Sequence, residues 1–204
     1  MVDLLTAIIL VVDFVISIWN SYTAGYNLGL AKRHEGPDWM FIYAAFGLLL
    51  GIVGTIYVLV IVIGLVAVSL GYIGPATIDV LLAYNFLVFG GLITLLGVGV
   101  TIQTWYVAIK THNKWSIVAS LWNTFASIWN VWSYISNFGL ATSIIKSESK
   151  EENEGGLIII LALAVVIAAA LSYLAYRAGS HKAQTEAAIA TPGGWNAGTQ
   201  NTSY

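Results

Sequence analysis

The chain has 204 residues, of which 58% are apolar and only 9% are charged. A soluble domain carries about a quarter charged residues, so this composition and a mean hydropathy of +0.82 exclude an ordinary water-soluble fold. The net charge of −2 gives no indication of a nucleic-acid partner. The absence of cysteine excludes disulfides, thiolate metal sites and thiol nucleophiles. The expected class is an all-α integral membrane protein whose main partner is the lipid bilayer.

Five apolar segments, each longer than 20 residues, are separated by short polar or Gly/Pro-containing loops. A helix needs about 20 apolar residues to cross the hydrocarbon core, so the pattern predicts a bundle of five transmembrane helices. The expected spans lie at about residues 4–31, 39–70, 77–109, 115–145 and 155–176. They form a predicted transmembrane domain over 1–178, followed by a polar tail over 179–204 that is expected to be flexible and disordered.

The basic residues fall unevenly on alternate loops of this topology. Six of the eight Lys and Arg residues lie on one side, and only Lys146 and Lys150 lie on the other, among four glutamates. The positive-inside rule then places the N-terminus outside and the C-terminal tail in the cytoplasm. Trp39, Trp105 and Trp115 lie at span ends that face the basic loops, where an interfacial aromatic belt is expected.

The first and fourth apolar segments each carry a polar stripe. The stripes consist of Asp13, Ser17, Asn20 and Asn27 in the first segment, and of Asn123, Ser127, Asn130 and Asn137 in the fourth. The acid and amides recur every seven residues, which is two helical turns, so each set lies on one helix face. An amide that points at lipid has no hydrogen-bond partner, which is costly. The stripes are therefore expected to face protein, water or each other.

Two interpretations of the stripes stay open. Interhelical polar contacts contribute about 0.6 kcal/mol each in membranes, so the stripes can simply hold helices together. Alternatively, they line a hydrated path or a solute site. Asp13 is relevant to both interpretations. No span contains a Lys or Arg that could form an ion pair with it. An acid within a span is a functional candidate, but Asp13 can also be a neutral member of a packing stripe.

A weak internal repeat relates the same two segments. Residues 17–31 read SIWNSYTAGYNLGLA and residues 127–141 read SIWNVWSYISNFGLA, with eight of fifteen positions identical and Asp13 opposite Asn123. In a five-span topology the two copies cross the membrane in opposite directions, as in inverted-repeat transporters, whose sites lie at the repeat interface. The other explanation, which stays the favoured one, is coincidence or convergent use of one packing motif.

No motif indicates an enzyme, and no catalytic residue, metal site or cofactor is expected. The chain lacks a phosphate-binding loop, HExxH and GxSxG, and no lysine lies in a span. Small residues at four-residue spacing, such as Gly25 and Gly29, permit close helix approach and favour a partner surface.

The leading functional expectation is a small structural or accessory subunit, non-enzymatic, that packs within a larger or homo-oligomeric membrane assembly through the Asn/Ser stripes. Its partners would be other membrane subunits or copies of itself. The alternative is a channel or transporter for an ion or small polar solute, with a site between the first and fourth helices.

Overall fold

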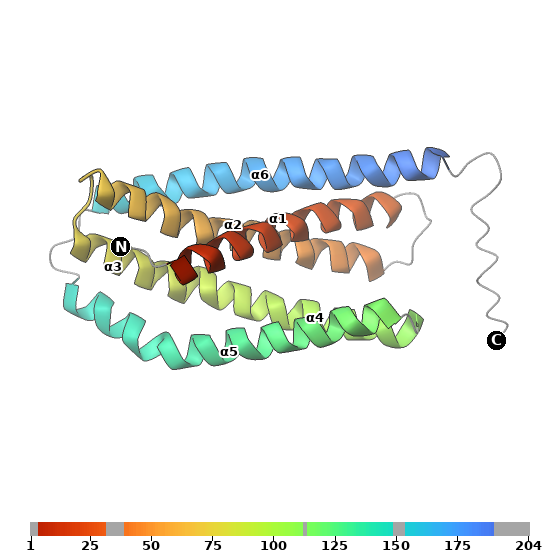
Figure 1. Ribbon diagram of the computed structural model, residues 1–204, viewed down its shortest axis with the longest axis horizontal. Helices are drawn as coiled ribbons and strands as arrows, with labels where there is room; N and C mark the ends of the chain where they lie inside the picture. The colour runs from red at the N-terminus through yellow and green to blue at the C-terminus, as the bar shows by residue number, and fades with distance from the viewer. Residues whose placement is uncertain (1–3, 32–38, 112–113, 149–153, 190–204) are drawn as a thin grey trace.

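The computed structural model describes residues 4–31, 39–111, 114–148 and 154–189, and these are almost entirely helical (Figure 1). The elements are α1 (Leu4–Ala31), α2 (Trp39–Ser69), α3 (Pro75–Asn85), the π-helical segment η1 (Phe86–Gly90), α4 (Gly91–Thr111), α5 (Lys114–Glu148) and α6 (Glu154–Ile189). No strand occurs in these ranges, so the predicted all-α class is confirmed.

The helices form long rods that run alternately in opposite directions (Figure 1). α3, η1 and α4 follow one another without a break and make one rod over 75–111. Four rods are long and apolar enough to cross a membrane: Ala7–Gly29, Phe41–Ser69, Pro75–Ile109 and Gly155–Thr185. Their length and composition support a multi-pass membrane protein. α5 is not among them, because its Asn, Ser, Thr and Trp residues lower its hydropathy.

A tight turn over 70–74 connects α2 to α3. Gly71 has a φ of +75°, a left-handed conformation that glycine adopts without a steric cost. The backbone N–H of Gly71 donates to the carbonyl of Val68, and that of Tyr72 to the carbonyl of Ala67, which satisfies two carbonyls in the last turn of α2. Pro75 then starts α3 at a position where its missing N–H costs nothing.

The end of α6 differs from the expected tail. The helix continues to Ile189, so residues 179–189 are helical and the expectation of a flexible tail is wrong for them. The stretch is rich in Ala, Lys, Gln and Glu, which are strong helix formers, and Ala183 is fully buried. An α-carbon substituent at Gly29 of α1 would meet the Ala183 side chain, so α1 holds this extension. Residues 190–204 lie outside the described residues.

Two groups of packed helices make up the bundle. α1 packs against α2 and α6, whereas α5 packs against α4 and α3, and α2 connects the two groups through its contacts with α3 and α4. An apolar core lies between α2, α3 and α6, around Val60, Leu81 and Ala164. No extensive contact joins α1 to α5 in the described part of the chain.

Candidate functional site

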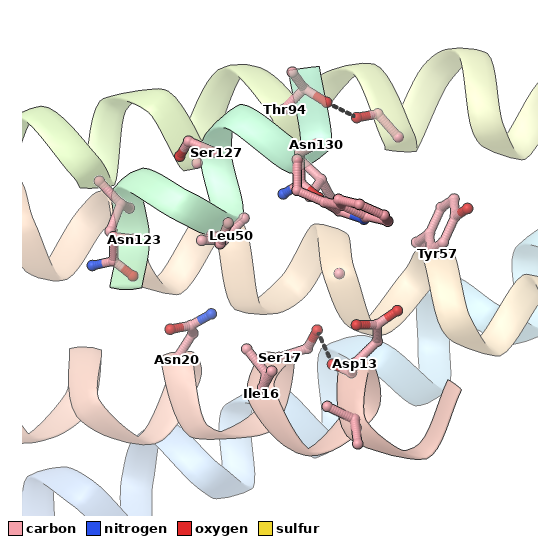
Figure 2. A pocket seen from close by; sticks show the side chains of 18 of the residues that line it. Asp13, Ile16, Ser17, Asn20, Leu50, Tyr57, Thr94, Asn123, Ser127 and Asn130 are labelled. Carbon is pink, nitrogen blue, oxygen red and sulfur yellow. Dashed lines mark hydrogen bonds between the residues drawn. The ribbon is translucent and has the colours of Figure 1, made fainter. Parts of the chain in front are cut away.

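A cavity of about 790 Å³ separates α1 from α5. Residues of α1, α2, η1, α4 and α5 line it, and Figure 2 shows lining side chains from α1, α2, α4 and α5. Small-molecule sites commonly have volumes of about 300–1,000 Å³, so the cavity has the size of a ligand site. We call it the α1–α5 groove.

The groove brings six of the eight predicted stripe residues together. These are Asp13, Ser17 and Asn20 from α1 and Asn123, Ser127 and Asn130 from α5. Asn27 and Asn137 do not line it; Asn137 is exposed and its Nδ2 donates to the carbonyl of Ser133 at 2.8 Å. A straight α-helix drifts by about 20° per seven residues, so a stripe of that period turns away from a fixed direction along the helix.

The two serines belong to the packing between helices. Ser17 is buried, its Oγ donates to the carbonyl of Asp13 at 2.7 Å, and it occupies the space that a side chain at Gly54 of α2 would need. Ser127 is buried as well, and its Oγ lies 2.7 Å from Oγ1 of Thr101 on α4. The serines therefore match the packing interpretation of the stripes.

Asp13, Asn20 and Asn130 instead present free polar groups to the groove. All three are half-buried, and Figure 2 shows their side chains in the space between the helices. Within the described residues no hydrogen bond reaches the Asp13 carboxyl group or the side-chain amides of Asn20 and Asn130; the only bond near Asp13 uses its backbone carbonyl. Polar groups without partners are costly in hydrocarbon, so a groove at membrane depth has to hold water or a polar ligand.

The similar residues of the internal repeat face each other across the groove. α1 and α5 run in opposite directions (Figure 1), and the equivalent pairs Ser17/Ser127, Trp19/Trp129, Asn20/Asn130 and Asp13/Asn123 all line the cavity. Asn20 and Asn130 lie near the middle of their helices. The two copies of the motif therefore form opposite walls of one site at mid-helix depth.

One end of the groove contains the π-helical segment, which the sequence analysis did not anticipate. Phe86 and Gly90 of η1 line the cavity. Tyr134 of α5 donates its hydroxyl to the carbonyl of Leu87 at 3.0 Å, and the Asn85 Nδ2 donates to the carbonyl of Tyr57 on α2 at 3.0 Å. π-Helical turns are frequent at functional sites. The available signal was Asn85, an amide in the middle of a mostly apolar stretch of the third segment.

Two threonines of α4 were also missed: Thr94 adds to the polar wall, and Thr101 packs against α5. Thr94 lines the cavity, and Thr101 contacts α5, where its Oγ1 lies 3.0 Å from the carbonyl of Asn123. The Trp105 Nε1 donates to Oγ1 of Thr124 at 2.9 Å, a second polar link between α4 and α5. Thr94 and Thr101 are seven residues apart, the same spacing as in the two stripes, and that spacing could have indicated them.

The described residues contain no group of three His, Cys, Asp or Glu side chains that could hold a metal ion. Comparisons with protein-family models, with curated proteins and with solved structures found no match to this chain. The functional argument therefore depends on the geometry of the groove.

Proposed function

We propose that the chain is a non-enzymatic, multi-pass integral membrane protein that binds a small polar or amphiphilic solute in the α1–α5 groove, as a channel or transporter does. The observation that supports this most strongly is the set of unpartnered polar side chains, Asp13, Asn20 and Asn130, that face a cavity of about 790 Å³. A packing stripe would place these groups against a neighbouring helix. Here they lie on opposite sides of open space.

The proposal treats α5 as the fifth membrane span. α5 has 35 residues, which at 1.5 Å per residue is roughly 50 Å and ample for a bilayer. It packs along α4, whose rod is apolar enough to cross a membrane. The polar residues that lower its hydropathy include Asn123, Ser127 and Asn130, which line the groove. A span that forms the wall of a polar site is expected to be less apolar than the others.

The accessory-subunit hypothesis loses part of its sequence support. The small residues that favoured a partner surface contact other helices of the same chain. Side chains at Gly25 and Gly29 would meet α6, and one at Gly51 would meet α1. Ala164 and Ala168 are fully buried. These close approaches hold the chain's own bundle together, so they give no independent reason for a second subunit.

Flux across proteoliposomes tests the proposal. Wild type should conduct at least one member of a panel of protons, alkali cations and small uncharged or charged organic solutes. Asp13→Asn and Asn130→Leu should each reduce that flux at least tenfold, because one removes the only acid of the groove and the other replaces a polar wall with an apolar one. Asp79→Asn is the matched control, since Asp79 is an exposed acid of α3 outside the groove.

Two results would contradict the proposal. One is a wild-type protein that is folded in liposomes and conducts nothing in the panel, which would favour the accessory-subunit hypothesis. The other is flux that Asp13→Asn and Asn130→Leu leave at the level of Asp79→Asn.

A further inference from the structure

The charge of the groove restricts the ligands that it can bind. Asp13 is the only carboxylic acid among the lining residues, and no Lys, Arg or His lies with it. An anionic ligand would find no positive charge there. A cation would find one carboxyl group that has no hydrogen-bond or ion-pair partner within the described residues. Charge complementarity therefore favours a positively charged ligand.

The aromatic lining indicates what kind of cation fits. Eight lining residues are aromatic: Trp19, Tyr43, Tyr57, Phe86, Trp122, Phe125, Trp129 and Tyr134. Aromatic faces attract organic cations, and Trp attracts them most strongly. A metal ion is instead held by oxygen ligands, which aromatic rings do not supply. The lining therefore suits an organic cation better than an inorganic one.

The rim of the groove lets an apolar ligand enter from the side. Trp19 on α1 and Trp122, Phe125 and Trp129 on α5 all line the cavity, yet they are 58–63% exposed. These side chains therefore form an open edge between two helices that do not pack against each other. In a bilayer, such an edge faces the hydrocarbon, so a ligand with apolar groups can reach the acid without crossing a polar mouth.

We infer that the α1–α5 groove binds a hydrophobic organic cation, such as an amine or quaternary ammonium with apolar substituents, whose charge pairs with Asp13 and whose apolar groups contact the tryptophan rim. The inference depends on the proposed function and names its ligand class. The amides of Asn20 and Asn130 line the same groove and satisfy polar substituents or water that accompany the cation.

The test is equilibrium binding of radiolabelled tetraphenylphosphonium to the full chain in lipid nanodiscs, with triphenylphosphine oxide as a neutral probe of similar shape. Wild type should bind the cation saturably and at least tenfold more tightly than the neutral probe. Asp13→Asn should remove that preference, and Asp79→Asn should keep it. Thermal unfolding of each variant shows whether it is folded.

The tryptophan rim is tested with two exposed aromatic residues. Trp122 lines the groove and is 63% exposed, whereas Tyr173 of α6 is 59% exposed and does not line it. Trp122→Leu should weaken cation binding at least threefold, and Tyr173→Leu should leave it unchanged. Equal losses from both would show that the rim makes no specific contact, which would overturn this part of the inference.

The outcomes separate the ligand class from the proposed function. If both probes bind equally and Asp13→Asn changes neither, the cation inference is wrong, but a solute-binding groove remains. If neither probe binds, and Asn130→Leu also leaves flux unchanged, the inference and the proposed function both fail.

Discussion

At the scale of single residues, the length of the polar side chain determines whether a stripe residue packs against a neighbouring helix or faces the groove. Ser17 and Ser127 are short and buried, and they fit against α2 and α4. Asn20 and Asn130 have longer side chains that end in a carboxamide, and these extend into open space from the same helix faces. The two interpretations of the stripes therefore apply to different residues of one stripe.

Thr101 is the residue whose loss should loosen the contact between α4 and α5. Its Oγ1 lies 2.7 Å from Ser127 Oγ and 3.0 Å from the carbonyl of Asn123. We predict that Thr101→Val keeps the shape of the side chain and lowers the free energy of unfolding by about 0.6 kcal/mol, and by at most about 1.7 kcal/mol. Denaturant titration in mixed micelles measures the change.

The control is Thr142→Val, because among the described residues the Thr142 hydroxyl donates to carbonyls of its own helix alone, at Phe138 and Gly139. It should change stability by a few tenths of a kcal/mol at most. A Thr101→Val protein that is as stable as Thr142→Val would show that the α4–α5 polar contact contributes nothing.

The sequence could predict the stripe residues but could not tell which of them pack. Spacing places Asp13, Ser17 and Asn20 on one face of a helix, whatever that face meets. Whether a serine meets a glycine or a threonine depends on the neighbouring helix. Gly54 is 37 residues away from Ser17 along the chain, and Thr101 is 26 residues away from Ser127. Only the packed structure relates them.

At the scale of elements, α1 and α6 approach each other backbone to backbone. A side chain at Gly25 would overlap the carbonyl of Tyr176, and one at Gly179 would overlap the carbonyl of Tyr22. Reciprocal glycines thus allow α6 to lie along α1 as far as Ala183. Close approach of this kind is the usual role of small residues between membrane helices.

The Gly25→Ala substitution tests the close contact between α1 and α6. The added methyl group has no space, so the helices must move apart, and overpacking of this kind costs about 1–3 kcal/mol. We predict a lower melting temperature for Gly25→Ala. Gly139→Ala is the control, because a side chain there meets nothing within 4 Å, and alanine is the better helix former. If both variants have the same melting temperature as wild type, α1 and α6 do not pack as described.

Element boundaries followed from the sequence where polar loops interrupt apolar runs, as at the starts of α2 at Trp39 and α5 at Lys114. The end of α6 and the segment Phe86–Gly90 could not be predicted in this way. In the sequence, the polar end of α6 resembles a disordered tail. Its packing against α1 is visible only in the structure. The π-helical turn is held by contacts from other helices, including the hydroxyl of Tyr134.

At the scale of the whole molecule, the predicted orientation can be tested at exposed positions of opposite ends. Tyr72 lies in the α2–α3 turn and is 74% exposed, and Thr185 lies near the end of α6 and is exposed. Because basic residues favour the cytoplasmic side, Tyr72→Cys should react with an impermeant thiol reagent in intact cells, and Thr185→Cys should react only after permeabilisation. The chain has no native cysteine to interfere. Reaction of Thr185→Cys in intact cells would reverse the orientation.

In the bundle as a whole, the antiparallel helices α1 and α5 carry similar polar stripes, lie on opposite sides of a cavity and are supported by the remaining helices. The central claim is that this cavity is a polar site within the membrane. Its walls have amides and an acid without partners, and such groups need water or a ligand.

Reaction of Asn130→Cys with a hydrophilic thiol reagent in proteoliposomes tests that claim most directly, because a thiol ionises and reacts only where water reaches it. Leu95→Cys is the control, since Leu95 is 71% exposed on α4 but does not line the groove. We predict that Asn130→Cys reacts at least tenfold faster than Leu95→Cys and that bound tetraphenylphosphonium slows it. Equal, slow reaction at both positions would contradict a polar site between α1 and α5.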